Sequence, residues 1–390
     1  MQECGGVEWD RCEMIQLRSI CLSAHLDSFC RCLNDFAGLE FVYQSDDPGA
    51  MRRKVGWKLD AQYRNGPQTR DSYARAQHCD ILIEMLREMP LMLQRANEGR
   101  KTVYVSERWL KPLVIKGIRF PGIFRLLSPS YFRMVKKFCK LMDNENFWVF
   151  ACGVHAARDF ARLYGLFHGD LCCLFKTPAV KVEKRLGGGV GNFRRLKVWG
   201  YFVEPSKPTS VAISSCESDV LKIFWCGRML DWKCVDDLVV AFDSVCKKRP
   251  AALLVVGEGE ERGRLQTLAG TRYAEGLTWT KGLISFNNYV SGDKVRELMR
   301  LADVYVMPSN EEEGWGAAVS DALTEGCGVI STYEAGSSAT LLDDDALYHC
   351  RDVHALAQKL IDFKKGCQTL PDMNLWSGAA GARTFMEVVK

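Results

Sequence analysis

Residues 301–330, LADVYVMPSNEEEGWGAAVSDALTEGCGVI, contain the pattern that decides the fold. Residues 304–307 are a short, continuously apolar run that Pro308 ends, and the spacing of apolar residues predicts a helix at 317–325 before a strand at 328–330. Strands that are apolar throughout are typical of parallel sheets that helices cover on both faces. The stretch therefore predicts a doubly wound α/β domain, whose ligands bind at the carboxyl ends of the strands.

The same alternation continues on both sides of this stretch. In the C-terminal half, further strands are predicted at 221–226, 252–256 and 277–280, and helices at 235–245, 260–269 and 293–302. The N-terminal half has a weaker form of the pattern, with strands predicted at 18–22, 80–83, 101–105, 147–151 and 197–202. The two prolines in residues 205–208 (PSKP) favour an extended linker between two doubly wound domains.

The composition excludes several classes of protein. The chain has 390 residues, of which 47% are hydrophobic and 26% charged, as in an ordinary globular protein. The formal net charge of +4 is too small to indicate nucleic-acid binding, so no nucleic acid is expected as a partner. Residues 1–20 lack the apolar core of a signal peptide, and no apolar run reaches the roughly 18 residues of a membrane-spanning helix. We therefore expect a cytoplasmic protein.

The cysteines are numerous and scattered. The chain has 17, an odd number, and several lie in apolar segments, which favours buried free thiols in a reducing compartment over a disulfide framework. The closely spaced pairs, Cys30 with Cys32 and Cys172 with Cys173, do not have the spacing of zinc ligands. The sequence therefore predicts no structural metal.

Two groups of chemically informative residues follow the first two predicted strands of the C-terminal half. Gly227 and Arg228 come directly after the first strand, and Lys233 lies five residues beyond Arg228, so that both cations can reach a pyrophosphate. Glu258 follows the second strand between two glycines, but Arg262 replaces the third glycine of a dinucleotide-binding fingerprint. Each group alone is also compatible with an ordinary surface loop.

A third group lies in the stretch quoted first. Glu313 is in a loop where Gly314 and Gly316 let backbone N–H groups turn toward a phosphate or a sugar. Asp321 follows eight residues later in the predicted helix, so the two carboxylates can hold the two ends of one polyhydroxylated ligand. The alternative is a solvated acidic loop with an exposed helix residue.

Together, these groups resemble the nucleotide-sugar-binding domain of the family-4 retaining glycosyltransferases (glycosyl transferases group 1) of the GT-B fold. The resemblance runs from about residue 223 to 363 and includes FWCGRMLDWK, VVGEGEERGRLQTLA, LADVYVMPS and EGWGAAVSDALTEGCGVI. It implies an α/β fold with two Rossmann-like, doubly wound parallel-sheet domains that face a cleft. Residues 1–205 would bind the acceptor, residues 206–370 would bind the nucleotide sugar, and a helix in 371–390 would pack back on the first domain.

The resemblance also implies roles for single residues. Arg228 and Lys233 would hold the donor diphosphate and stabilise its leaving charge in place of a metal ion, so neither a metal nor a cofactor is expected. Glu313 would contact the donor sugar and support an oxocarbenium-like transition state. These three are the predicted catalytic residues, and residues 281–285 would line the base. The predicted donor-binding residues are Gly227, Glu258, Gly282, Leu283, Gly314, Trp315, Gly316 and Asp321.

The sequence departs from the family pattern at three places. Asp321 replaces the second Glu of the family's signature of two Glu separated by seven residues, so a shorter carboxylate would have to reach the nucleotide ribose. Cys234 stands where the family usually has Gly, and Ala335-Gly336 keeps only half of a glycine pair.

The N-terminal half would bind the acceptor. The candidates on this side are His25, Glu107 and His155, which follow predicted strands. The alternatives are a capping or packing role for His25 and an ion pair between Glu107 and Arg108. Residues 187–191 (GGGVG) are interpreted as a flexible loop, and residues 131–141 as a packed helix with a solvated basic edge, with contact to anionic lipids as the alternative.

The sequence thus predicts a hexosyltransferase-type enzyme that moves a sugar, with retention, from a nucleotide-diphosphate sugar to a glycan or lipid-linked saccharide in bacterial surface polysaccharide biosynthesis. Its expected place is the cytoplasm, with peripheral contact at the inner membrane face as a further option. The alternatives are a GT-B epimerase or phosphorylase, and a catalytically weakened nucleotide-sugar-binding protein.

Overall fold

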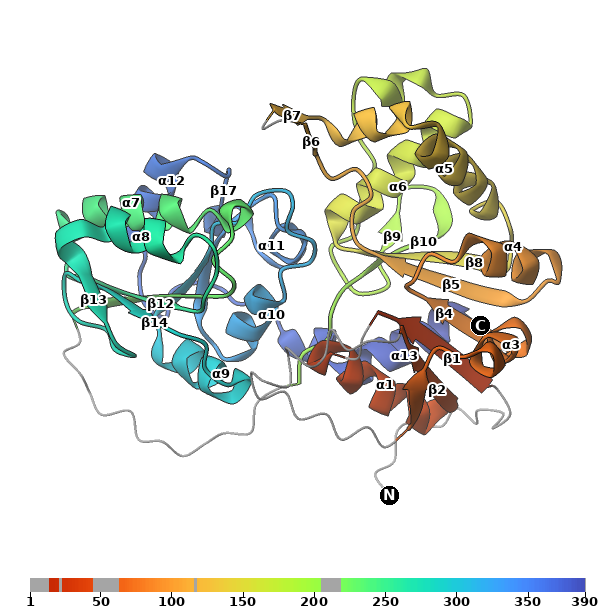
Figure 1. Cartoon of the computed structure of the whole chain (residues 1–390), viewed down its shortest axis with the longest axis horizontal. Coiled ribbons are helices and arrows are strands. Elements are labelled where there is room, and N and C mark those ends of the chain that lie inside the picture. Colours follow the sequence, from red (N-terminus) through yellow and green to blue (C-terminus); the bar gives the residue numbers. More distant parts are fainter. Residues whose placement is uncertain (1–13, 21–22, 45–62, 116–117, 205–218, 390) are drawn as a thin grey trace.

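The computed structural model describes residues 14–20, 23–44, 63–115, 118–204 and 219–389. These residues form two lobes, each built around its own sheet (Figure 1). The predicted linker at 205–208, and the predicted domain boundary with it, lies outside the described residues.

The N-terminal lobe contains an eight-stranded sheet in the order β3-β2-β1-β4-β5-β8-β10-β9. Its strands are parallel except for β9, which is antiparallel to β10. The strands are β1 (Met14–Ser19), β2 (Gly38–Tyr43), β3 (Arg64–Pro67), β4 (Ile81–Glu84), β5 (Lys101–Ser106), β8 (Phe147–Cys152), β9 (Gly189–Val190) and β10 (Phe193–Trp199). The helices are α1 (Ala24–Phe36), α3 (Arg70–His78), α4 (Met89–Asn97), α5 (Pro129–Leu141) and α6 (Val154–Phe167).

Shorter elements of this lobe lie outside the sheet. A hairpin of β6 (Leu113–Ile115) and β7 (Ile118–Phe120) extends from the lobe beyond β5 (Figure 1). Two 3₁₀ helices, η1 (Gly122–Leu127) and η2 (Leu171–Leu174), pack against α5 and α6 respectively.

The C-terminal lobe contains a seven-stranded parallel sheet in the order β13-β14-β12-β11-β15-β16-β17. The strands are β11 (Leu221–Cys226), β12 (Ala251–Val256), β13 (Tyr273–Glu275), β14 (Ile284–Asn287), β15 (Val304–Met307), β16 (Gly328–Thr332) and β17 (Leu347–Tyr348). The α-helices are α7 (Val235–Cys246), α8 (Arg262–Ala269), α9 (Gly292–Leu301), α10 (Ala317–Thr324), α11 (Gly336–Leu341) and α12 (Val353–Asp362). Short 3₁₀ helices are η3 (Asp231–Lys233), η4 (Gly270–Arg272), η5 (Asp344–Ala346) and η6 (Met373–Trp376).

The central strand β15 explains why the sequence pattern was continuously apolar. Val304 and Val306 point into a core shared with α7 and α12, whereas Tyr305 and Met307 point into the core shared with α9 and α10. All four side chains are buried, because helices cover both faces of the sheet (Figure 1). The doubly wound architecture expected from residues 301–330 is therefore confirmed.

The strand predicted at 277–280 is wrong. The chain forms β13 and β14 on either side of this segment instead. The indole Nε1 of Trp279 donates a hydrogen bond to the carbonyl oxygen of Ile223 at 2.9 Å, and the Trp279 ring packs against Phe224. The apolar character of the segment thus reflects a side chain that covers the sheet and not a strand within it.

Other predicted boundaries are displaced. β1 begins at Met14 and not at residue 18, and β10 occupies Phe193–Trp199 and not 197–202. Residues 187–191, interpreted as a loop, contain the edge strand β9, which pairs with β10. A Cβ atom at Gly188 would lie 2.3 Å from the carbonyl oxygen of Glu183, so this tight approach requires glycine.

The chain returns to the N-terminal lobe through α13 (Gly378–Val389), which packs against α1 (Figure 1). The ring of Phe385 lies 6.0 Å from that of Phe29 and 5.9 Å from that of Phe150, measured between centroids. A Cβ atom at Gly378 would lie 2.1 Å from the Ser28 hydroxyl, so the two helices are in close contact. This helix completes the core of the N-terminal lobe.

Candidate active site

The candidate site lies where the strand order of the C-terminal sheet reverses. From β11 the chain continues to β12 on one side, and it later returns to β15 on the other side of β11. In an open parallel sheet, this reversal leaves a crevice at the carboxyl ends of the two central strands. Lys233 follows β11 and Glu313 follows β15, so both lie at the reversal point.

Lys233 and Glu313 contact each other directly. The Lys233 Nζ atom is 2.5 Å from Glu313 Oε2, and the side chains are 16% and 10% exposed. The ammonium also lies 4.3 Å from the centroid of the Trp232 ring, a cation–π contact. The two residues that the sequence predicted from separate strand ends therefore share one partly buried position.

The glycine loops after β11 and β12 pack backbone against backbone. A Cβ atom at Gly257 would lie 1.9 Å from the Gly227 carbonyl oxygen, and one at Gly259 would lie 2.3 Å from the Met229 carbonyl oxygen. Both glycines have positive φ, which other residues rarely adopt. This close packing leaves Arg228 and Glu258 exposed at the same edge of the sheet as Lys233.

The acidic loop after β15 is held by hydrogen bonds from its own lobe. Asn310 N–H donates to Trp232 O at 2.9 Å, which ties the loop to the turn that carries Lys233. Gly336 N–H donates to Gly314 O at 2.9 Å. Gly316 adopts a left-handed conformation, with φ of 82°, at the start of α10. The position of Glu313 is thus fixed from both sides.

Glu107 of the N-terminal lobe packs onto this loop. Its Oε1 accepts hydrogen bonds from Tyr201 Oη at 2.7 Å and from the Trp315 backbone N–H at 3.1 Å. Lys111 Nζ lies 3.5 Å from Glu107 Oε2 and donates to Glu312 O at 3.0 Å. The alternative ion pair with Arg108 is not formed, since Arg108 contacts Asp159 instead. Glu107 therefore joins the lobes at the predicted donor site.

His25 and Asp321 also meet between the lobes. The His25 Nε2 atom is 3.2 Å from Asp321 Oδ1, and the two side chains are 14% and 21% exposed. The sequence had assigned His25 to the acceptor side and Asp321 to the donor side. The structure brings them into one contact.

His155 makes a further contact between the lobes. Its Nε2 lies 2.7 Å from the Tyr333 carbonyl oxygen, which can only accept, so Nε2 carries the proton. Burial lowers the pKa of His155 to about 4, with smaller contributions from the positive charges of Arg108, Arg158 and Lys184. His155 is therefore a neutral hydrogen-bond donor in the contact between the lobes.

Gly282 and Leu283 do not belong to this site. They precede β14, so they lie at the amino end of a parallel strand, at the edge of the sheet opposite Gly227 and Glu313. Gly282 O accepts a hydrogen bond from Arg272 Nη1 at 2.9 Å. The family resemblance implied that they line the base, but a position at the amino end of β14 does not fit that role.

Two tyrosines at the site were missed by the sequence analysis. Tyr289 follows the carboxyl end of β14, and its hydroxyl donates to Glu258 O at 3.3 Å while its side chain remains partly exposed. A strand predicted at 284–287 would have placed Tyr289 at the carboxyl end of that strand, and so at the site. Tyr201 follows β10 and contacts Glu107, but it lies in no motif.

Trp315 is the structural centre of the contact between the lobes. It is fully buried, and its indole Nε1 donates to Ser320 Oγ at 3.1 Å. Its ring lies 5.5 Å from the Trp376 ring, and a Cβ atom at Gly200 would lie 2.5 Å from it. The side chain thus packs between the lobes, and only its backbone is available near the predicted donor.

The C-terminal lobe is similar to known proteins. Residues 221–365 match the group 1 glycosyl transferases. Two uncharacterized glycosyltransferases of Methanocaldococcus jannaschii are also similar, MJ1069 with 26% identity over 125 residues and MJ1607 with 25% over 170 residues. These alignments cover 32% and 43% of this chain but 30% and 40% of the relatives, so the chain spans less than half the length of the curated relatives that it matches.

Similar solved structures show the fold of the described residues in both lobes. The Anabaena protein HepE, crystallised with UDP and glucose, is 14% identical with a TM-score of 0.56, and the alignment covers 97% of each chain. The lipopolysaccharide outer core galactosyltransferase WaaB is 10% identical with a TM-score of 0.59, over 97% of this chain and 99% of WaaB. The fold is GT-B, as the sequence predicted. In the described part of the chain, no helix is both long and apolar enough to cross a bilayer.

Proposed function

We propose that this protein is a retaining glycosyltransferase that moves a sugar from a nucleotide-diphosphate donor to a lipid-linked saccharide or glycan. The contact of 2.5 Å between Lys233 and Glu313 carries the proposal. A diphosphate beside the ammonium and a sugar beside the carboxylate would place the bond between them at this point. The match of residues 221–365 to group 1 glycosyl transferases supports this arrangement.

Each residue has a separate task in the reaction. Arg228 is exposed beside the loop of Gly227, where its guanidinium can bind the diphosphate in a bidentate manner, and Lys233 neutralises the charge that develops on the leaving phosphate. Glu313 accepts hydrogen bonds from sugar hydroxyls and stabilises the positive charge of an oxocarbenium-like transition state. These cations lie where a metal ion would otherwise bind the diphosphate, so we propose that transfer requires no metal.

The residues around this pair orient the donor. The backbone N–H of Gly316 lies at the start of α10, where it can face a phosphate or a sugar oxygen. The Trp315 N–H is bonded to Glu107, so it becomes available to a donor only when Glu107 moves. Asp321 is held by His25, so a ribose that binds this carboxylate would share it with His25 or displace His25. We therefore expect donor binding to rearrange the contact of Glu107 with the Trp315 backbone.

The tip of the N-terminal lobe supports a membrane-bound acceptor. Exposed apolar side chains gather on the β6–β7 hairpin, η1, the start of α5 and the η2 segment, namely Val114, Ile115, Ile118, Phe124, Leu127, Phe132, Leu171, Leu174 and Phe175. Residues 113–141 contain seven Lys or Arg and no Asp or Glu. Arg119 of this segment pairs with Glu311 at 2.8 Å. A segment that combines exposed apolar side chains with an excess of cations fits an anionic lipid surface, which attracts the cations and accepts the apolar groups.

Donor binding and turnover test the enzyme assignment. A panel of UDP-, GDP- and ADP-sugars should raise the melting temperature with one preferred base, because the donor binds only the folded protein. With that donor, Glu313→Gln should abolish transfer and donor hydrolysis, whereas the surface control Glu297→Gln should retain both. Full turnover in Glu313→Gln would reject the proposal, as would the absence of any stabilising nucleotide sugar.

Two further measurements separate the alternatives. The anomeric configuration of the product, determined by NMR before it equilibrates, should match that of the donor, and inversion would refute the retaining assignment. A purified protein without the visible absorbance of pyridoxal phosphate dismisses the phosphorylase, and an epimer of the donor as the product would favour the epimerase.

Vesicle sedimentation tests the membrane surface. The protein should sediment with phosphatidylglycerol vesicles and not with phosphatidylcholine vesicles, and Leu127→Asp with Phe175→Asp should abolish this binding. The matched control Leu375→Asp replaces an exposed leucine elsewhere and should still bind. Equal sedimentation of the two variants would refute the proposed surface without affecting the assignment of the donor site.

A further inference from the structure

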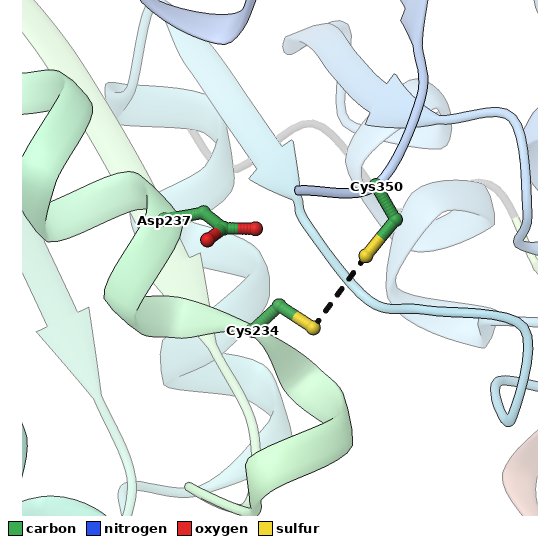
Figure 2. Close-up of side chains that lie close together, drawn as sticks. All are labelled: Cys234, Asp237 and Cys350. Atoms are coloured by element: carbon green, nitrogen blue, oxygen red, sulfur yellow. Dashed lines mark hydrogen bonds between the residues drawn. The ribbon is translucent and has the colours of Figure 1, made fainter. Parts of the chain in front are cut away.

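Two thiols and a carboxylate lie close together next to the turn that carries Lys233, since Cys234 directly follows Lys233. Figure 2 shows the three side chains. Cys234 directly precedes α7, Asp237 lies in the first turn of α7, and Cys350 follows β17. The two sulfur atoms are 3.6 Å apart, and one ligand atom from each of the three residues lies within 4.8 Å of the others. The side chains point toward a common centre (Figure 2). This cluster has no role in the proposed transfer reaction.

The spacing of the sulfur atoms matches a metal site. Two thiolates on one tetrahedral zinc ion, each about 2.3 Å from the metal, are about 3.8 Å apart. A disulfide requires about 2.0 Å between the sulfur atoms. The observed 3.6 Å is close to the first value, although Cys234 and Cys350 are separated by 116 residues in the sequence.

The backbone is strained on both sides of the cluster. Among the described residues, three that are not glycine have a positive φ, and two of them are Cys234, with φ of 49°, and Arg351, with φ of 69°. Left-handed backbone in such residues is unfavourable and persists where the surrounding structure requires it. Here it directs the Cys234 sulfur toward Cys350, at a position where glycine would be less strained.

Asp237 supplies an independent indication of a cation. The residue is 5% exposed, and its Oδ1 accepts a hydrogen bond from Arg351 Nη1 at 3.0 Å. The Arg351 backbone N–H also approaches this carboxylate. Within the part of the chain that the structure describes, the other oxygen, Oδ2, is nevertheless buried and has no hydrogen-bond partner. A buried carboxylate oxygen without a donor is uncommon, and a bound cation would satisfy it.

The charges of the cluster suit a divalent cation. Two thiolates and the Asp237 carboxylate carry three negative charges, of which a zinc ion neutralises two. Arg351 Nη1 lies 3.0 Å from Asp237 Oδ1 and also 3.0 Å from Asp236 Oδ1, so its charge is shared between the two carboxylates. The N-terminus of α7 stabilises the thiolate of Cys234 further. Sulfur ligands favour zinc over magnesium or calcium, which prefer oxygen.

We propose that Cys234, Cys350 and Asp237 bind one zinc ion, with water as the fourth ligand. On binding, each thiol releases its proton to the solvent as its sulfur forms a bond to zinc, and no electrons are transferred. The ion would connect the loop after β17 to the turn that carries Lys233. The role of this zinc ion is structural, and its site is separate from the site that binds the donor.

Zinc binding to the whole chain tests this proposal. The reduced, chelator-treated protein should bind one zinc ion in competition with a chromogenic chelator, and cobalt should give the thiolate charge-transfer and intense visible bands of a tetrahedral site. Affinity should fall at least a hundredfold in Cys350→Ser, Cys234→Gly and Asp237→Asn. The control Cys246→Ser removes a thiol at the far end of α7 and should bind zinc normally.

The same variants exclude misfolding as the explanation. Cys234→Gly accepts the left-handed backbone, so it should keep its circular dichroism and cooperative melting while losing zinc. Because two thiol protons are released, the affinity of the native protein should fall about a hundredfold per unit decrease in pH below neutrality. Zinc binding that is equal in Cys350→Ser and the native protein would overturn the site. So would a reduced protein that binds no zinc and forms only a Cys234–Cys350 disulfide, two mass units lighter, on oxidation.

Discussion

Acidification should weaken the contact between the lobes through His155. In the folded protein, burial against Tyr333 holds the pKa of His155 at about 4, whereas an unfolded chain has a histidine pKa of about 6.5. Between these values the unfolded chain binds a proton that the folded protein does not. The free energy of unfolding should therefore decrease as the pH falls from 6.5 toward 4.

The size of this effect follows from the two pKa values. Each unit of difference is worth about 1.4 kcal/mol, and summing the two titrations gives a loss of about 2 kcal/mol at pH 5 and about 3 kcal/mol at pH 4. The His155 side chain is only partly exposed, so solvent screening reduces these values only modestly.

A substitution isolates this contribution from the other groups that titrate. Gln in place of His155 can donate a hydrogen bond to the Tyr333 carbonyl but cannot gain a proton. Urea unfolding at pH 7 and pH 5 should show that the native protein loses about 2 kcal/mol more than His155→Gln over this interval. An equal loss in both proteins would refute the assignment of a neutral, buried His155.

Three further predictions concern other parts of the molecule. Arg228→Ala should lower the transfer rate about a hundredfold or more at an unchanged melting temperature, because the side chain is exposed but binds the leaving diphosphate; a normal rate would contradict that role. Gly314→Ala places a Cβ 1.8 Å from Glu107 Oε2 and should lower stability by about 1–3 kcal/mol, measured by urea unfolding. Adding Glu107→Ala should recover part of the loss, and simple additivity would argue against the contact. Phe385→Ala should cost about 3–5 kcal/mol in urea unfolding, and a change below 1 kcal/mol would contradict the packing of α13.

The sequence predicted those functional residues whose position depends on where the preceding strand ends. Lys233 and Glu313 could be predicted as partners because each follows an apolar strand, and parallel strands end at one edge of a sheet. The fold followed from the same pattern. The assignment of Gly282 and Leu283 to the base, which the family resemblance implied, does not fit the structure, because both residues lie at the amino end of β14.

Contacts between distant segments could not be predicted in this way. Glu107 meets the Trp315 backbone, and Cys234 meets Cys350, only because of how separate loops or lobes pack. No periodicity or spacing within one segment encodes such packing, because the two partners lie far apart in the sequence. Spacing rules detect zinc ligands that lie near one another in the chain, and they overlook ligands contributed by two distant loops.

The return of α13 to the first lobe affects the order in which the protein can be completed during synthesis. The ribosome makes residues 14–204 first, but Phe29 and Phe150 receive the ring of Phe385 only after the whole second lobe has been translated. Until then the first lobe has an uncovered apolar surface beside α1. The second lobe has its sheet and α-helices within residues 221–362. It can therefore become compact before α13 is available to pack on the first lobe.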